Sequence, residues 1–343
     1  MSPSDFGSSG SSDLSNWFGL REVLKQNMVT PLIVLGAGAS HDFTHPTHLG
    51  VSNHREYIIF PLTNDLISLV DKEIEARYSG FKTMRSLITS SIVSKRKSFE
   101  ECVESWGDYE QRTALLLYLG DYFYKKSNDP QIEILPNNFL ALIDLINKSP
   151  SKKANFVTFN YDLLLEKAID PTLRQFFNLP DYVKGSIRIV KIHGSCDWYS
   201  LMSRVGNDVY SALKEHPEFF SRPIREILTK RWLNQPNSGA NQFFLVPVIS
   251  IPTMSTKSYS CPQEHIQVLN ESLPSTEKIL IIGWKAGDQF LLEKLKAIKS
   301  PVDLTVVSGT EDGAKETTKI LKKYIETKKE TIFVGFSDFI GSN

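Results

Sequence analysis

The sequence has few cysteines, no net charge and no long apolar run, and each of these absences narrows its class. Its three cysteines, Cys102, Cys196 and Cys261, contain no CxxC pair, which argues against a disulfide framework and a structural zinc module. Lys plus Arg and Asp plus Glu number 39 each, so no net field draws the chain to nucleic acid or to an anionic bilayer. No apolar run approaches the roughly 20 residues that span a membrane, and no secretion signal is recognisable. We therefore expect a cytoplasmic protein with no membrane partner and no direct nucleic-acid partner.

Short apolar runs that stop at polar or glycine-containing turns predict an α/β fold. Most of these runs lack polar alternation, which is typical of strands covered on both faces. We predict a Rossmann-like, mostly parallel sheet with helices on both faces, within a single domain over residues 17–343 that follows a flexible Ser/Gly-rich tail over residues 1–16. The expected strands are Pro31–Gly36, Asn155–Phe159, Ile187–Ile192, Phe243–Val246, Lys278–Ile282 and Val302–Val307.

Helical periodicity between the first two strands predicts an inserted helical subdomain over about residues 61–150. Its apolar stripes are Leu62, Leu66, Val70 and Ile74, then Ser98–Lys126 and Phe139–Ile146. A second insertion over about residues 200–275 is rich in Pro, Ser and Asn and has one expected strand and several turns. Further helices are expected over Leu163–Ile169, Ala286–Ile298 and Asp312–Lys328.

The first candidate site is the turn Gly36-Ala37-Gly38-Ala39-Ser40, which directly follows a buried strand. Glycines there let a backbone approach a pyrophosphate closely, while amides and the Ser40 hydroxyl supply donors. The third glycine of a GxGxxG dehydrogenase fingerprint is missing, because His41 stands in its place. A tight turn that needs positive φ is the alternative interpretation.

Polar residues also follow two other strands. Thr158, Asn160 and Asp162 close the strand Asn155–Phe159, and the carboxyl ends of parallel strands are where open α/β sheets bind ligands. A carboxamide such as Asn160 can orient a water or a ribose hydroxyl; the alternative interpretation is that Asn160 or Asp162 only caps the next helix. His193, after the strand Ile187–Ile192, can accept a proton near neutral pH.

Two further strand ends and one histidine group complete the candidates. Gly283 in Ile281-Ile282-Gly283-Trp284 and Ser308 after Val302–Val307 can admit a nucleotide at the same sheet edge. The histidines His41, His45 and His48 lack acidic partners at ligand spacing, so no metal site is predicted there.

In this order, GAGAS at 36–40, TFNYD at 158–162, HG at 193–194 and IIGW at 281–284 resemble the SIR2-like (sirtuin-fold) family, in particular the bacterial NADase branch of anti-phage defence systems. The resemblance spans roughly residues 31–308. It implies that Gly36, Ala37, Gly38 and Ser40 hold the pyrophosphate of NAD and that Asn160 and His193 act at the nicotinamide ribose. Thr158, Asp162, Gly283 and Ser308 complete the NAD-binding set that it implies.

The resemblance implies NAD as a substrate, no metal, and hydrolysis of the nicotinamide–ribose bond. Protein-deacylating sirtuins carry a four-cysteine zinc module that three cysteines cannot build, and the residues after Ser40 lack the deacylase-like Ile-Pro-Asp-Phe-Arg element. Water is therefore the expected acceptor. A homo-oligomer or an activating protein partner is expected to control the activity. The alternatives are a module that senses NAD or ADP-ribose without turnover, and a deacylase or ADP-ribosyltransferase.

Overall fold

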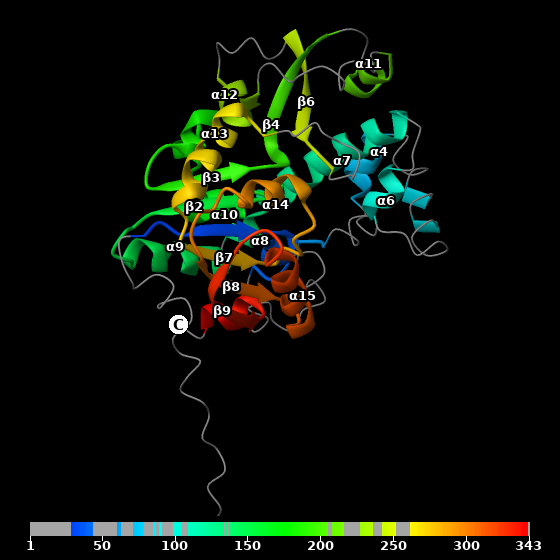
Figure 1. Cartoon of the computed structure of the whole chain (residues 1–343). Coiled ribbons are helices and arrows are strands. Elements are labelled where there is room, and N and C mark those ends of the chain that lie inside the picture. The colour runs from blue at the N-terminus through cyan, green and yellow to red at the C-terminus, as the bar shows by residue number, and fades with distance from the viewer. Residues whose placement is uncertain are drawn as a thin grey trace, which may run out of the picture.

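A computed structural model of the chain, drawn in Figure 1, describes most residues from 109 onward and shorter segments before them. The described residues are 29–43, 60–62, 71–78, 85–86, 89–90, 99–104, 109–133, 135, 137–204, 208–215, 227–235, 242–251 and 261–341. Several expectations lie outside these residues: the tail over residues 1–16, Leu66, Val70, His45 and His48.

A six-stranded sheet, parallel throughout, forms the centre of the molecule, in the order β3-β2-β1-β7-β8-β9 (Figure 1). This confirms the predicted Rossmann-like α/β class. The central strands β1 and β7 are buried along their whole length, because neighbouring strands and helices cover them, and they are apolar apart from Lys278, which opens β7. The strands are β1 (Leu32–Leu35), β2 (Ala154–Thr158), β3 (Ile187–Lys191), β7 (Lys278–Ile282), β8 (Val302–Ser308) and β9 (Thr327–Val334).

Helices pack on both faces of this sheet and divide the buried side chains into two clusters. Alternate strand residues such as Ile33 and Leu35 join the cluster with α7, α9, α10 and α16, whereas Leu32 and Val34 join the cluster with α13, α14 and α15. These helices are α7 (Tyr109–Ser127), α9 (Asn138–Lys148), α10 (Leu164–Ile169), α13 (Gln263–Ser272), α14 (Gln289–Leu295), α15 (Glu311–Leu321) and α16 (Phe336–Gly341).

The edge strand β9 corrects the sequence prediction. The expected helix Asp312–Lys328 ends as α15 at Leu321, and Thr327 begins β9. This strand opens with the charged residues Lys328, Lys329 and Glu330, which are exposed at the sheet edge. Such an edge strand lacks the continuous apolar run of the central strands, so its sequence resembles a solvated helix.

Helices fill the chain between β1 and β2 in the described segments. They are α2 (Ala37–His41), α4 (Lys72–Arg77), α6 (Phe99–Glu104), α7, α8 (Pro130–Glu133) and α9. Leu62, placed in the first apolar stripe, lies outside these helices, whereas Ile74 lies within α4 and is buried.

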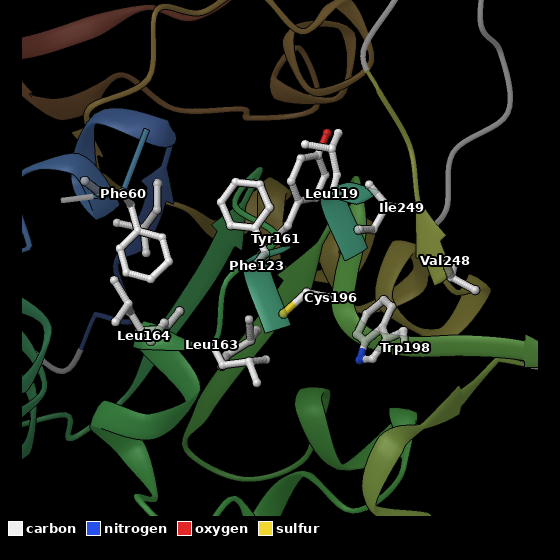
Figure 2. Packing of buried hydrophobic residues seen from close by; sticks show 14 of the residues in the cluster. Phe60, Leu119, Phe123, Tyr161, Leu163, Leu164, Cys196, Trp198, Val248 and Ile249 are labelled. Atoms are coloured by element: carbon white, nitrogen blue, oxygen red, sulfur yellow. The ribbon is translucent and has the colours of Figure 1, made fainter. Parts of the chain in front are cut away.

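A second, antiparallel sheet of order β5-β4-β6 follows β3. It contains β4 (Gly194–Ser203), β5 (Leu228–Thr229) and β6 (Phe243–Ile249), with α11 (Val209–Glu215) and α12 (Lys230–Leu233) beside it. The predicted strand Phe243–Val246 therefore exists as β6 but belongs to this sheet. Figure 2 shows its residues Trp198, Val248 and Ile249 packing with Phe123 and Leu119 of α7 and Tyr161 beyond β2.

The remaining short elements connect these layers. They are the 3-10 helices Arg174–Phe176, Leu179–Val183 and Leu273–Ser275. The three cysteines are free thiols and all are buried. Among the described helices, none combines the length and apolar character needed to cross a bilayer.

Candidate functional site

Sheet register brings the predicted site residues to one edge. At the carboxyl end, Leu35 of β1 pairs with Thr158 of β2 and with Ile282 of β7. In turn, Thr158 pairs with Lys191 of β3, and Ile282 with Val307 of β8. The turns that carry Gly36, Asn160, His193, Gly283 and Ser308 therefore leave adjacent strands at the same level. This is the edge at which open parallel sheets bind ligands.

The glycine turn is held against the end of β7 by backbone contacts. The N–H groups of Gly36 and Gly38 donate to the carbonyl oxygens of Ile282 and Gly283, at 2.9 and 3.1 Å. A Cβ on Gly36 would lie 2.5 Å from the Gly283 oxygen, and one on Gly283 would lie 2.3 Å from the Ala39 nitrogen. Glycine is therefore required here by the approach of two turns, independently of any ligand.

The N–H groups available to the predicted phosphate site lie in the first turn of α2. Because α2 begins at Ala37, the N–H of Ala37 has no acceptor within the helix. Ala37 and Gly38 are half-buried, whereas Ser40 is 2% exposed and lies beneath the turn. The part of the turn that a ligand can reach is thus the Ala37-Gly38 backbone.

Hydrogen bonds on both sides hold Asn160 in place. Its backbone N–H donates to Thr158 Oγ1 at 3.1 Å, and its Nδ2 donates to Ser40 Oγ at 2.8 Å. Thr158 and Ser40 are buried, but Asn160 itself is half-buried. Since Nδ2 is engaged with Ser40, the carboxamide presents its oxygen, Oδ1, on the other side. Asn160 is a fixed polar group at an accessible strand end.

Asp162 anchors this loop from within the protein. It is 4% exposed, and its Oδ1 accepts the N–H of Leu164 at 3.1 Å. Burial raises the pKa of Asp162, while the nearby Lys191 charge and a hydrogen bond from Ser40 oppose that rise. The series Asn160, Ser40, Asp162 therefore runs from the accessible edge into the core.

The buried Lys191 fixes the loop from the neighbouring strand. Its Nζ lies 2.7 Å from the Asp162 carbonyl oxygen and 2.7 Å from Glu166 Oε1, and both ionic side chains of the pair are 1% exposed. Burial lowers the pKa of Lys191, but the charges of Glu166 and Asp162 outweigh burial and raise it. Lys191 remains a cation and ties β3 to the loop after β2.

His193 has a carboxylate partner, Asp288, on the crossover between β7 and β8. Its Nε2 lies 3.1 Å from Oδ2 of Asp288, and the two side chains are 5% and 9% exposed. The ring also meets Phe159 edge-to-face with centroids 5.0 Å apart, and Phe159 stacks on Trp284 at 5.1 Å. Two contacts thus define the imidazole's position and tilt.

Three hydrogen bonds, two between backbone groups and one from a tyrosine side chain, connect the loops of Asn160 and His193. The N–H of Cys196 donates to the Tyr161 carbonyl oxygen at 2.9 Å, and Tyr161 Oη donates to the Ser250 carbonyl oxygen at 2.8 Å. Ser250 in turn donates its N–H to the His193 carbonyl oxygen at 2.9 Å. A closed set of bonds therefore ties the two loops together.

The predicted residues fall into accessible and supporting groups. Asn160, Ala37 and Gly38 are half-buried, whereas His193, which follows the neighbouring strand β3 at the same edge, is buried at 4% exposure. Ser40, Thr158 and Asp162 are buried and hold Asn160, and Gly36 and Gly283 join two turns. Ser308 ends β8, where its carbonyl oxygen accepts the Gly335 N–H at 2.7 Å. The roles in NAD binding that the sequence assigned to these residues stay predictions.

Sequence reasoning missed three supporting residues: Asp288, Lys191 and Phe159. Asp288 carried a local signal, since aspartate is a frequent N-cap, but it lay inside the predicted helix Ala286–Ile298, whereas α14 begins just after it. Its contact with His193 joins residues 95 positions apart, which no local pattern encodes. Lys191 looked like an ordinary polar end of a strand.

Within the described part of the chain, no group of three or more His, Cys, Asp or Glu side chains is arranged to hold a metal ion. His41 donates its Nδ1–H to the Phe60 carbonyl oxygen at 2.8 Å. Its predicted neighbours His45 and His48 lie outside the described residues.

Comparison with known proteins finds no matching family model and no matching curated protein. Solved structures of Sir2 enzymes are similar in fold. One, from work on the mechanism and regulation of Sir2 enzymes, is 14% identical with a TM-score of 0.41, covering 94% of this chain and 93% of its own. Another, bound to a myristoylated histone peptide, is 12% identical with a TM-score of 0.40, and the match covers 94% of this chain and 91% of that one. Sequence identities and TM-scores this low do not assign a function to this chain.

Proposed function

We propose that the chain is an NAD+ glycohydrolase, which cleaves the nicotinamide–ribose bond to give nicotinamide and ADP-ribose. The observation that carries this proposal is the half-buried carboxamide of Asn160, fixed through Ser40 and set at the same sheet edge as His193 and the glycine turn. The ordered motifs that resemble SIR2-like NADases add the substrate. In this proposal NAD is consumed, and no metal takes part.

The glycine turn would bind the pyrophosphate. The Ala37 N–H starts α2 with no intrahelical acceptor, and Ala37 and Gly38, whose own side chains are no larger than a methyl group, are half-buried. A pyrophosphate placed there would direct the nicotinamide ribose along the edge toward Asn160 on the adjacent strand. Gly283 and Ser308 would border the nucleotide on the other side of β1.

Asn160 would orient the attacking water. The bond between ribose C1′ and the pyridinium nitrogen breaks with its electron pair leaving on nitrogen, so nicotinamide departs as a neutral base. Water then adds its oxygen to C1′ and loses a proton. A carboxamide oxygen fixed by the Ser40 contact can hold that water in one orientation, which lowers the entropic barrier.

His193 would accept the proton from the water or from a ribose hydroxyl. Its carboxylate partner supports this role, because a carboxylate stabilises the imidazolium that forms. Ser40, Thr158 and Asp162 would act as positioning residues through Asn160.

The test is release of nicotinamide, measured chromatographically on a concentrated sample of the full chain with NAD. Asn160→Ala and His193→Ala should each reduce release by about 100-fold or more, because each removes a positioned polar group from the reacting centre. Asn270→Ala, an exposed residue of α13 where that helix approaches the opposite edge of the sheet, serves as the matched control and should keep wild-type turnover. Retained turnover in both site variants would exclude this assignment.

The same experiment separates the other classes. Binding of NAD or ADP-ribose without release of nicotinamide under activating conditions would favour a sensing module. Consumption of NAD that requires a protein acceptor would indicate a deacylase or ADP-ribosyltransferase. We also propose, from the resemblance alone, that the enzyme is a regulated effector of anti-phage defence in the cytoplasm, controlled by an oligomer or an activating partner.

A further inference from the structure

The carboxylate of Asp288 joins His193 to the start of helix α14. The two oxygens of Asp288 have different partners. Oδ1 accepts the N–H of Leu291 at 2.8 Å and thereby caps α14, while Oδ2 lies 3.1 Å from His193 Nε2. The helix cap fixes the carboxylate, so its second oxygen has a defined direction.

An ionised carboxylate only accepts hydrogen bonds, and this decides which histidine nitrogen carries the proton. With Oδ2 opposite it, Nε2 must be the N–H nitrogen of the neutral ring. Nδ1 then carries the lone pair. The edge-to-face contact with Phe159 restricts rotation of the ring that would exchange the two nitrogens.

From this geometry we infer that Asp288 is the positioning residue of His193 and fixes its imidazole in the Nε2–H tautomer, so that Nδ1 is the basic nitrogen. The role in turnover rests on the proposed function, but the tautomer does not. Asp288 couples α14 to the end of β3, and it acts on substrate only through His193.

Two substitutions separate this role from the helix cap. Asp288→Asn keeps a good N-cap, but its Nδ2 faces His193 and can only donate, so Nε2 must become the acceptor and the tautomer inverts. Asp288→Ser also caps α14, yet its shorter side chain does not reach the imidazole. Asp208→Asn is the matched control, since Asp208 accepts from Ser211 N at 2.9 Å at the start of α11, away from the sheet edge.

The first measurement is the ¹⁵N NMR spectrum of histidine-labelled full-length chain without ligand, with the His193 signal assigned by its loss in His193→Gln. We expect the Nε2–H form in the wild type and in Asp208→Asn, the Nδ1–H form in Asp288→Asn, and a mixture in Asp288→Ser. A wild-type His193 protonated at Nδ1, or a tautomer unchanged in both Asp288 variants, would overturn the inference.

The second measurement is nicotinamide release. Asp288→Asn should lower kcat by about 100-fold or more with KM within a few-fold, because a wrong tautomer removes the base and leaves binding intact. Unchanged kcat in a variant whose tautomer is inverted would remove Asp288 from the mechanism. A wild type that binds NAD without turnover would defeat the proposed function and leave the NMR result as the test of the tautomer.

Discussion

At the scale of single residues, the glycines of the first candidate site have an internal reason to be glycine. Gly283 adopts φ +63°, in the left-handed region, and its Cα faces the backbone of Gly38 and Ala39. The sequence predicted that these glycines allow the backbone to approach a pyrophosphate. In the structure they allow the backbones of two turns to pack directly against each other. This close backbone packing also fixes the position of the glycine turn relative to the end of β7.

Gly283→Ala is therefore expected to destabilise the fold by about 3 kcal/mol or more, since strained φ and overpacking each cost ~1–3 kcal/mol. The added Cβ would lie 2.3 Å from the Ala39 nitrogen, and neither backbone segment can turn aside as a side chain would. The free energy of unfolding in urea measures the effect. Gly287→Ala, where a Cβ meets nothing within 4 Å, should change it by less than about 0.5 kcal/mol. Equal effects of the two changes would contradict the packing argument.

At the scale of elements, α13 buries an ionisable side chain against the second sheet. His265 is fully buried, its Nε2 lies 3.1 Å from the Leu179 carbonyl oxygen, and its ring meets Trp198 edge-to-face at 5.4 Å. Burial lowers the pKa of His265 to about 4, below its usual value near 6.5. Between about pH 4 and pH 6.5, the ring is therefore mostly neutral in the folded protein and mostly protonated in the unfolded chain.

This difference predicts that acid weakens the fold through α13. Stability from the depressed pKa is fully present above pH ~6.5 and is lost as the pH falls toward 4, because the unfolded state binds the extra proton first. Between pH 7 and pH 5 the loss amounts to about 2 kcal/mol. Urea unfolding of the wild type and of His265→Gln at both pH values measures it: the variant should be less stable at pH 7 but lose about 2 kcal/mol less on acidification. The same acid loss in both proteins would rule out His265 as its source.

The elements themselves differ in how far sequence predicted them. The central strands β1, β2, β7 and β8 and the edge strand β3 were predicted within one residue at each end, because their apolar runs mark largely buried strands. The edge strand β9 and the strands β4 and β5 of the second sheet were missed. The charges of β9 face solvent, and β4 begins at Gly194, inside the turn expected after His193.

The candidate site residues, like the strands, could be predicted only where the local sequence carried the signal. Asn160 and His193 were found because each ends a strand that sequence could locate. Their partners Ser40 and Asp288 lie 120 and 95 residues away, and such contacts depend on strand order and crossover geometry, which local patterns do not contain.

At the scale of the whole molecule, the glycine turn is tied to the C-terminal helix. Asp42, just beyond α2, accepts the N–H groups of Phe336 and Ser337 at 2.7 and 3.1 Å and the Ser337 hydroxyl at 2.6 Å. Asn138 at the start of α9 donates to the Asp42 carbonyl oxygen and to Ser337 Oγ. Segments nearly 300 residues apart therefore meet directly behind the candidate phosphate turn.

Asp42→Ala should loosen α16 and lower global stability together. Loss of a capping carboxylate that accepts three hydrogen bonds is expected to cost about 2–3 kcal/mol. Amide hydrogen exchange measures both effects: protection should fall most in α16 and by a smaller, uniform amount in the central strands. Asp144→Ala removes an exposed i,i+4 pair with Lys148 and should cost no more than about 0.5 kcal/mol. If exchange in α16 stays at the wild-type rate in Asp42→Ala, the apolar contacts of Phe336 and Phe339 alone hold the helix, and the turn and the C-terminus are not coupled through Asp42.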